Sequence, residues 1–189
     1  SLFRVDQLYR KFLYHFRESR QTTLLNDLAE DVRNHYTNTF LRKLGDAWQA
    51  KVDELTNWSI PNVLAQRQFF DKEVFGNYLK NSNKIIVVIS DALRYEAGEE
   101  LARLIRQEDR FEATLTAGIT GLPSYTQLGM ASLLPNKSIQ LENDAMVSVS
   151  VDGQLSTGLI NRGKILNTAP VDNTQVIKSE ELLNLTGAD

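Results

Sequence analysis

Cysteine is absent from the 189 residues of this sequence, and histidine occurs only twice. The lack of cysteine excludes disulfides and thiolate metal sites, which is typical of a reducing compartment, and we expect a cytoplasmic protein. His15 and His35 both fall in helical patterns, so we interpret them as helix-face residues rather than metal ligands. So few histidines also argue against a Ser-His-Asp triad.

Long apolar runs are absent as well. No run approaches the roughly 20 residues that a helix needs to cross a bilayer, and charges recur through the N-terminal stretch, unlike in a signal peptide. We therefore expect no membrane contact. Neither a Walker A motif nor a G-x-G-x-x-G loop is present, which argues against a glycine-rich nucleotide cradle. The net charge of -3 and the pI near 5.5 argue against a nucleic-acid footprint over the whole chain, and leave a local patch open.

The first 80 residues show the spacing of helices. Apolar residues of the first pattern recur every three or four positions and are Val5, Leu8, Tyr9, Phe12 and Phe16. A longer stripe, from Leu25 to Leu55, predicts one long helix or two with a break near Gly45, with the first helix as the nearest packing partner. A third helical stretch covers residues 62–79. We expect residues 1–80 to form a helical arm that contacts protein or nucleic acid.

Further along the chain, strand patterns alternate with helical ones. "IIVVIS", residues 85–90, is rich in β-branched residues and predicts a strand buried on both faces, as in a parallel sheet. A helical pattern follows to Ile105, and "FEATLT", residues 111–116, predicts the next strand. The next helix is predicted to start at Ser124, with Gln127 three residues on as in a capping box. This order indicates a βαβ unit.

The C-terminal part carries weaker patterns. Alternation on both sides of Asp152 and Gly153 predicts a β-hairpin. Residues 159–166 predict a short helix, and residues 174–185 predict a short strand followed by a helix capped by Ser179. These elements extend the α/β part beyond the βαβ unit.

Asp91 stands directly after the predicted strand 85–90. In open α/β sheets, ligands bind at the carboxyl ends of the strands, and carboxylate oxygen suits Mg²⁺, Mn²⁺, Ca²⁺ or Zn²⁺. The alternative is that Asp91 merely caps the following helix, because aspartate is a favoured N-cap residue. Both interpretations stay open from this residue alone.

Ser124 and Thr126 lie at the predicted start of the next helix. Helix N-termini favour anions, and a metal makes a hydroxyl easier to ionise, but plain capping by either hydroxyl is the alternative. Two successive βα turns would present a carboxylate and a hydroxyl on the same edge of one sheet, so we predict that Asp91 and Thr126 lie close together. A third candidate is Arg94, whose planar guanidinium suits a phosphate or, equally well, a nearby carboxylate.

Four stretches together resemble the PglZ family of the alkaline phosphatase superfamily, which is associated with bacterial phage defence of the BREX type. They are "QRQFFDKEV" at residues 66–74, "VVISDALRYEAGEEL" at 87–101, "GITGLPSYTQLGMASLLP" at 118–135 and "VDGQLSTGLINRGKIL" at 151–166. The resemblance covers roughly residues 60–166 well and the helical N-terminus loosely.

The resemblance implies an alkaline-phosphatase-like fold, a mainly parallel sheet with flanking helices, of which residues 81–189 would be the N-terminal portion. It also implies that Asp91 holds a divalent metal, Zn²⁺ first with Mn²⁺ or Mg²⁺ as alternatives, and that Thr126 is the nucleophile that contacts this metal. Arg94 would steady the phosphoryl oxygens. The implied partners are other proteins of the defence system, with DNA as a further candidate.

The sequence departs from the superfamily pattern because no later segment carries the further aspartate and histidine ligands. We therefore expect a fragment of a metal-dependent hydrolase of phosphate esters, or of a nuclease. By itself the fragment is expected to be inactive and to bind metal weakly or not at all. The competing hypothesis is a non-catalytic scaffold that assembles a defence complex through the helical arm.

Overall fold

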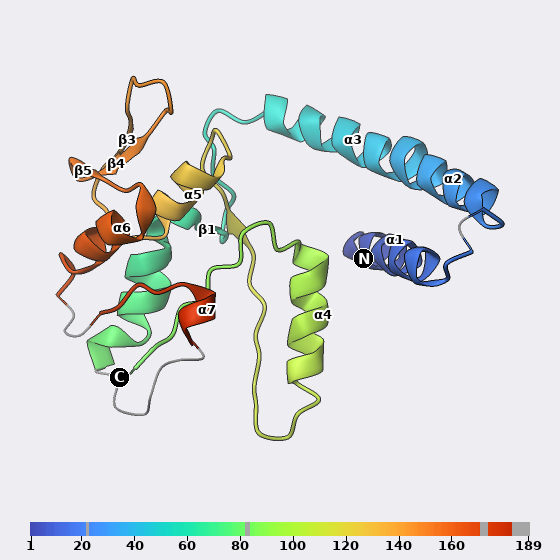
Figure 1. Cartoon of the computed structure of the whole chain (residues 1–189). Coiled ribbons are helices and arrows are strands. Elements are labelled where there is room, and N and C mark those ends of the chain that lie inside the picture. Colours follow the sequence, from blue (N-terminus) through green and yellow to red (C-terminus); the bar gives the residue numbers. More distant parts are fainter. Residues whose placement is uncertain (22, 82–83, 171–173, 183–189) are drawn as a thin grey trace. The chain divides into compact units, whose positions relative to one another are not determined.

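The computed structural model describes residues 1–21, 23–81, 84–170 and 174–182, and it has a mixed α/β fold (Figure 1). The expected fold class is confirmed at that level. The chain forms two compact units: a helical unit of Ser1–Trp58 and Ala92–Thr116, and an α/β unit of Ser59–Asp91 and Ala117–Asp189. Residues 59–81, expected in the arm, thus belong to the α/β unit, and residues 92–116 belong to the helical unit.

The helical unit contains one long helical rod, seen in Figure 1 as the run from α2 to α3. It consists of α2 (Asn26–Asn34), a π-helical stretch η1 (His35–Leu41) and α3 (Arg42–Asp53). Of the two alternatives predicted, the single long helix is the one present, because Gly45 lies inside α3 and the helical run is unbroken there, with a change in winding at η1. One glycine costs a helix about 1 kcal/mol relative to alanine, which is too little to end a helix between good helix formers.

Helix α1 (Phe3–Glu18) packs against the rod through aromatic rings. Tyr9 stacks on Tyr36 with the ring centroids 3.7 Å apart, so the rod does find its partner in the first helix. The predicted apolar face of α1 is only partly right, because Leu8 is 60% exposed while Gln7 is buried. A buried amide needs hydrogen-bond partners, and Gln7 finds them on α4.

Helix α4 (Tyr95–Ile105) completes the helical unit, and it confirms the helix predicted after Asp91. The amide nitrogen of Gln7 donates to the backbone oxygen of Glu96 over 2.9 Å and to Glu99 Oε2 over 2.6 Å. The rings of Phe3 and Tyr95 meet edge-on with centroids 5.7 Å apart. The N-terminal helices are therefore joined to a helix that lies far along the chain.

The α/β unit begins with a short parallel strand pair. Strand β1 (Leu64–Ala65) pairs with β2 (Gly118–Ile119), so the helix predicted over residues 62–79 is wrong in its first part. Three short helical segments follow β1: the 3-10 helices η2 (Gln66–Gln68) and η4 (Leu79–Asn81) and, between them, the π-helical η3 (Phe70–Gly76). Segment η3 buries Phe70 and Val74 in an apolar cluster.

The two strands predicted at residues 85–90 and 111–116 are not formed among the described residues. Both segments run as connections without strand pairing, and parallel pairing begins only at Gly118. A strand requires a second backbone about 4.8 Å away, and the described residues supply no such partner to residues 85–90. A segment that is rich in β-branched residues does not form a strand unless a neighbouring strand pairs with its backbone.

A separate antiparallel sheet has the order β3 (Ile139–Leu141), β4 (Val149–Val151), β5 (Gln154–Leu155). The predicted hairpin is confirmed, because Val151 pairs with Gln154 across the turn at Asp152 and Gly153. Both turn residues have positive φ, 49° and 80°, as a two-residue turn between twisted strands requires.

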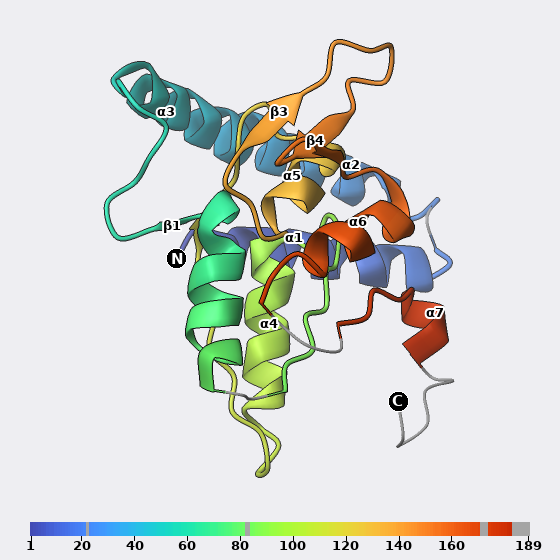
Figure 2. The same cartoon turned by 90° about the vertical axis from the view of Figure 1, so that its left-hand side faces the viewer.

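Helices α5 (Thr126–Ser132) and α6 (Gly158–Leu166) lie beside this sheet and close the core of the α/β unit (Figure 2). Helix α6 confirms the helix predicted over residues 159–166. The core consists of small and aliphatic side chains at most 8% exposed: Ala131, Leu134, Val149, Val151 and Ile165.

The last described helix is α7 (Ser179–Leu182), which begins at the serine where a helix start is predicted. The strand predicted before it is not formed over residues 174–178, and residues 183–185 of the predicted helix lie outside the described residues. Of the helices in the described ranges, none combines the length and the apolar character that a membrane crossing needs.

Candidate active site

Asp91 and Thr126 lie next to each other in the α/β unit. Thr126 Oγ1 donates a hydrogen bond of 3.3 Å to Asp91 Oδ2, although the two residues are 35 positions apart in sequence. Both residues are exposed in the part of the chain that the structure describes. The predicted proximity is therefore present, but not at the end of a formed strand, because residues 85–90 do not pair. The chemical roles of both residues stay predictions.

Asp91 is not the N-cap residue of the helix that follows it. The N-cap residue of α4 is Arg94, whose side chain forms no capping hydrogen bond. Ala92, directly after Asp91, has a φ of 57°, a left-handed conformation that is unfavourable for a residue with a Cβ atom. The chain thus bends sharply after Asp91, and the simple capping interpretation of this carboxylate is wrong.

The hydroxyl of Thr126 is likewise not used to cap its own helix. Tyr125 is the N-cap residue of α5 and Thr126 is the first helical residue, with no side-chain cap. The capping box predicted for Ser124 and Gln127 is therefore not formed. The sequence pattern places the helix start two residues early, because a serine three positions before a glutamine fits the motif whether or not the backbone turns there.

Hydrogen bonds from neighbouring elements anchor the segment that carries Thr126. Thr120 Oγ1 donates to Gln66 Oε1 over 2.9 Å, and Gln66 Nε2 donates to the backbone oxygen of Gly129 over 3.3 Å. The Tyr125 hydroxyl donates to the backbone oxygen of Val147 over 2.9 Å. One glutamine thus links α5 to the loop before it, and Tyr125 ties the helix start to the chain before β4. Such support restricts the position of the segment that carries Thr126.

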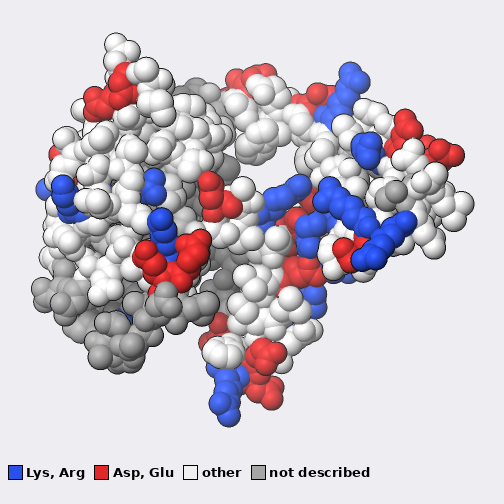
Figure 3. Space-filling view, in the orientation of Figure 1, with Lys and Arg blue, Asp and Glu red and all other residues white. Residues whose placement is uncertain are grey.

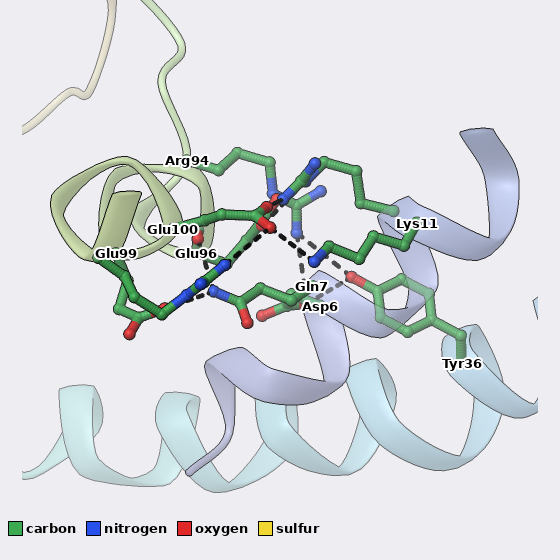
Figure 4. A network of polar contacts seen from close by, with 10 residues as sticks. Asp6, Gln7, Lys11, Tyr36, Arg94, Glu96, Glu99 and Glu100 are labelled. Carbon is green, nitrogen blue, oxygen red and sulfur yellow. Dashed lines mark hydrogen bonds and ion pairs between the residues drawn. The ribbon is translucent and has the colours of Figure 1, made fainter. Parts of the chain in front are cut away.

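Arg94, the predicted phosphate ligand, contacts two side chains of the helical unit (Figure 4). Its Nη2 atom lies 3.3 Å from Asp6 Oδ1 and 3.3 Å from the Tyr36 hydroxyl oxygen, and that hydroxyl donates to Asp6 over 2.6 Å. The hydrogen bond to Tyr36 raises the pKa of Arg94, while burial and the bond to Asp6 raise the pKa of Tyr36. Of the two partners predicted for Arg94, a carboxylate is present in the structure. Phosphate binding by Arg94 stays a prediction.

A larger polar network joins α1 to α4, and the sequence reasoning missed it (Figure 4). Arg10 Nε donates to both carboxylate oxygens of Glu96, at 2.8 and 2.9 Å, and Arg10 Nη2 bonds to Glu100. Lys11 Nζ lies 2.6 Å from Glu100. Glu96 is only 2% exposed. The available signal is "EAGEE" itself, which places three glutamates on one side of α4.

The positive charge of this network is paired locally. In Figure 3, several Lys and Arg side chains on the helical unit lie beside Asp and Glu side chains. Hydrogen bonds from Lys11 and then Arg10 hold the pKa of Glu100 down at about 2. Cations that face carboxylates in this way add little to the attraction of a nucleic-acid backbone.

Asp91 and Thr126 offer one carboxylate and one hydroxyl, which are oxygen ligands suited to a divalent cation. A catalytic zinc site usually has three protein ligands, and no cluster of three or more His, Cys, Asp or Glu residues occurs in the described ranges. Gln127 directly follows Thr126 in the sequence. Its Oε1 atom is buried and has no hydrogen-bond partner among the described residues. The described residues therefore fit part of a metal site and do not complete one.

Comparison with known proteins gives relatives for nearly the whole chain. Residues 69–189 match the family described as "BREX system PglZ alkaline phosphatase-like domain". The chain is 37% identical over 194 residues to the alkaline phosphatase-like protein BrxZ of Escherichia coli O9:H4 (strain HS), an alignment of 98% of the chain and 22% of that protein. It is 33% identical over 174 residues to the alkaline phosphatase-like protein PglZ of Bacillus cereus (strain H3081.97), with 91% and 20% aligned.

The chain spans about a fifth of the length of these curated relatives. No solved structure matches it. Because the two alignments cover 98% and 91% of the chain, the similarity reaches beyond residues 69–189 into the N-terminal helices.

Proposed function

The chain belongs to the PglZ family of BREX-system alkaline phosphatase-like proteins, and from that premise we propose that its full-length protein hydrolyses phosphate esters in phage defence. The residues proposed to act are Thr126 as nucleophile, Asp91 as metal ligand and Arg94 as phosphate ligand. The observation that carries the proposal is the 3.3 Å contact between Thr126 Oγ1 and Asp91 Oδ2.

The geometry supports this assignment in two ways. The N-cap residues of α4 and α5 are Arg94 and Tyr125, so neither Asp91 nor Thr126 is the N-cap residue of the helix that follows it, and the two side chains contact each other instead. Thr126 Oγ1 would form the new bond to phosphorus as the bond to the ester oxygen breaks, its hydroxyl proton would pass to solvent, and the leaving oxygen would take up a proton. Water would then attack the phosphothreonine, release phosphate and restore the hydroxyl. The Asp91 carboxylate, which accepts the hydrogen bond of Thr126, would orient the hydroxyl for attack. The exposure of both residues leaves space for an ester group.

A divalent metal completes the proposal, with Zn²⁺ expected and Mn²⁺ or Mg²⁺ as alternatives. Asp91 and Thr126 would hold it, and when bound such an ion neutralises phosphoryl charge and lowers the pKa of a coordinated hydroxyl. The remaining ligands would come from residues of the full-length protein outside the described ranges. The proposed partners are other proteins of the BREX system, and DNA is a candidate substrate.

A non-catalytic scaffold is the second candidate function. The observation that favours it is the helical unit, whose partly buried ion pairs between α1 and α4 build a firm body suited to holding partner proteins. In that case Asp91 and Thr126 would be a remnant of the superfamily site without turnover.

The deciding experiment compares full-length wild type with Thr126→Ala, using an aryl phosphate ester and DNA as separate substrates with Zn²⁺, Mn²⁺ or Mg²⁺. Loss of the nucleophile is expected to lower kcat by about a thousandfold or more. The matched control is Ser124→Ala, because Ser124 is an exposed hydroxyl two residues away that forms no capping box. Equal rates for wild type and Thr126→Ala would disprove the nucleophile, and absence of turnover in wild type would favour the scaffold.

Metal binding is tested separately by calorimetry on the same proteins. Asp91→Ala is expected to weaken the affinity at least tenfold, whereas Asp109→Ala, another exposed aspartate, should leave it unchanged. The 189-residue chain itself is expected to bind metal weakly or not at all. Tight stoichiometric binding by this chain would show that its own residues complete the site.

A further inference from the structure

The apolar stripe of the helical rod, the run from α2 to α3 in Figure 1, is packed only along its first half. In that half Ala29 and Tyr36 are buried, and Tyr36 stacks on Tyr9 of α1. The stripe continues into α3, where no described side chain is buried. We call this second half the distal stripe, and it consists of Leu41, Leu44, Trp48, Val52 and Leu55.

The distal stripe is open to a large extent. Leu41, Trp48 and Leu55 are 39%, 51% and 42% exposed. Trp58 meets Trp48 edge-on, with ring centroids 6.5 Å apart, and covers it only in part. The backbone N–H of Leu55 donates to the oxygen of Val52, so Leu55 continues the last turn. Steps of three and four residues put the five side chains on one side of the helix, in a row about 20 Å long.

The order of residues in the distal stripe is the same in both directions from Trp48. Leu44 lies four positions before Trp48 and Val52 four positions after it, while Leu41 and Leu55 lie seven before and seven after. A second copy that runs antiparallel, with a two-fold axis at Trp48, would therefore place Leu44 of one copy against Val52 of the other. A contact between identical surfaces requires this self-complementary order, whereas a contact with a different partner does not.

The charges beside the distal stripe follow the same symmetry. Arg42 and Lys43 stand six and five positions before Trp48, and Asp53 and Glu54 stand five and six positions after it. Acidic groups in the last turn of a helix interact unfavourably with its dipole, so this order does not stabilise the rod by itself. In an antiparallel pair, the basic start of α3 in one copy lies beside the acidic end of α3 in the other. A parallel pair would bring like charges together.

The acidic end of α3 forms exposed contacts within the chain. Gln49 Nε2 donates to Asp53 Oδ1 over 2.7 Å, and Lys51 Nζ lies 3.1 Å from Glu54 Oε2. The side chains of Lys51 and Glu54 are 72% and 67% exposed. Such an exposed pair contributes little to stability, so it can be exchanged for a contact with another molecule.

Gly45 lies in the middle of α3, at the edge of the distal stripe. Glycine destabilises a helix interior relative to alanine. A Cβ atom at this position would meet no described atom within 4 Å outside its own helix backbone. Packing within the described chain therefore does not require a glycine here, but a second helix that approaches α3 closely would.

We propose that the distal stripe is a self-association surface, on which two copies of this protein pair through antiparallel α3 helices about a two-fold axis at Trp48. The apolar order and the charge order both favour a second copy over an unrelated segment, because only a contact between identical surfaces requires them to be symmetrical. The proposal does not depend on phosphate-ester hydrolysis.

The size of the distal stripe indicates a weak and reversible dimer. It spans about four helical turns, which is small beside a standard interface that buries about 800 Å² per partner. We therefore expect a dissociation constant on the order of 10 µM. Because charges contribute to the contact, added salt should weaken it.

The first test is sedimentation equilibrium of the full-length protein at concentrations from about 1 to about 200 µM, which bracket the expected dissociation constant. Trp48→Ala should raise that constant at least about 30-fold, because an aromatic side chain at the centre of an interface carries much of the binding energy. The matched control is Tyr14→Ala, since Tyr14 is an aromatic residue of α1 that is 60% exposed. A monomer at every concentration, or an equally strong dimer in Trp48→Ala, would overturn the proposal.

The second test exchanges the charges at the two ends of α3 in the full-length protein. One double variant, Arg42→Glu with Lys43→Glu, has acidic residues at both ends, and another, Asp53→Lys with Glu54→Lys, has basic residues at both ends. Each variant alone should dimerise at least about tenfold more weakly than wild type, because like charges then face each other. An equimolar mixture of the two should form a heterodimer with about the wild-type affinity.

The matched control for the acidic variant is Arg20→Glu with Arg33→Glu, which changes the net charge equally at exposed positions of the helical unit and should dimerise like wild type. In the basic variant the new lysines suit the dipole of α3, so unfolding of this helix would not explain weaker association. If the mixture did not recover, or if the control were as weak as the acidic variant, the proposal would be overturned, whatever the hydrolytic activity of the protein.

Discussion

In the helical unit the buried side chains include Glu96 at 2% and Gln7 at 4% exposure, whereas the α/β unit buries Ala131, Val149 and Ile165 at 0%, 0% and 2%. The first unit joins two helices by hydrogen bonds and ion pairs, and the second joins helices to a sheet by apolar contact. Apolar burial hardly depends on pH, while ion pairs depend on pH and salt. One change of conditions should therefore act differently on the two units.

The positions of the tryptophans allow the units to be followed separately. Both tryptophans of the sequence, Trp48 and Trp58, lie in the helical unit, with ring centroids 6.5 Å apart. Their fluorescence reports this unit. Amide exchange in β4 and α6 reports the α/β unit. Together the two signals assign a loss of stability to one unit or the other.

The largest effect is expected in the apolar core. Ile165→Ala should lower the free energy of unfolding of the α/β unit by about 2–5 kcal/mol, because it leaves a cavity beside Val149 and Val151. Amide exchange in β4 should accelerate, and the tryptophan signal should change little. The control is Ile160→Ala on the same helix, which removes a side chain that is 78% exposed and should cost little. If the unfolding transition followed by tryptophan fluorescence showed an equal loss of stability, the two units would unfold together.

A smaller effect is expected in the polar network. Glu96→Gln keeps the shape of the side chain but removes the charge that faces Arg10, and it should destabilise the helical unit by about 1–3 kcal/mol. Tryptophan fluorescence in a denaturant titration measures this loss. Glu54→Gln is the control, since Glu54 forms an exposed pair with Lys51 that should contribute at most about 0.5 kcal/mol. If both variants lower the free energy of unfolding by the same amount, the burial of Glu96 does not contribute to stability.

The sequence predicts well where the structure is decided locally. The hairpin at Asp152 and Gly153 follows from turn chemistry, and α6 follows from a short apolar period. The approach of Thr126 to Asp91 follows from two turns in succession, even though the strand before Asp91 does not pair. The conformation of a turn depends on its own residues, whereas strand pairing depends on a distant neighbour.

The polar contact between α1 and α4 could not be predicted, because a helical stripe marks only apolar partners. Gln7 and Arg10 look like solvated surface in the sequence, and so does Glu96. Their burial becomes visible only when two helices 86 positions apart are side by side. Arg94 shows the same limit, since the sequence left phosphate and carboxylate open and only the fold brings Asp6 to it.

The smallest effect concerns Glu100, and its pH dependence is followed in the helical unit. Hydrogen bonds from Lys11 and Arg10 lower the pKa of Glu100 from 4.5 to about 2. A carboxyl group whose pKa is lower in the folded state contributes its stability above its unfolded pKa. That contribution is lost as pH falls toward the folded value. Between about pH 4.5 and pH 2 the helical unit should therefore lose this contribution. The α/β unit has carboxyl groups of its own with a lowered pKa, since the backbone N–H of Ser148 donates to Asp144 and, against the effect of burial, the backbone N–H groups of Ser138 and Lys137 donate to Asp152, so the loss from Glu100 is followed through the tryptophans.

Tryptophan fluorescence during an acid titration at low salt measures this loss. In Glu100→Gln the helical unit should be less stable at neutral pH, and its stability should depend less on pH between 4.5 and 2. Glu30→Gln, an exposed glutamate of α2 in the same unit, is the control and should follow wild type. Added salt should reduce the difference between wild type and Glu100→Gln, because the ions screen partly exposed pairs. An acid transition that stays identical in wild type and Glu100→Gln would mean that Lys11 and Arg10 contact this carboxylate without stabilising the unit.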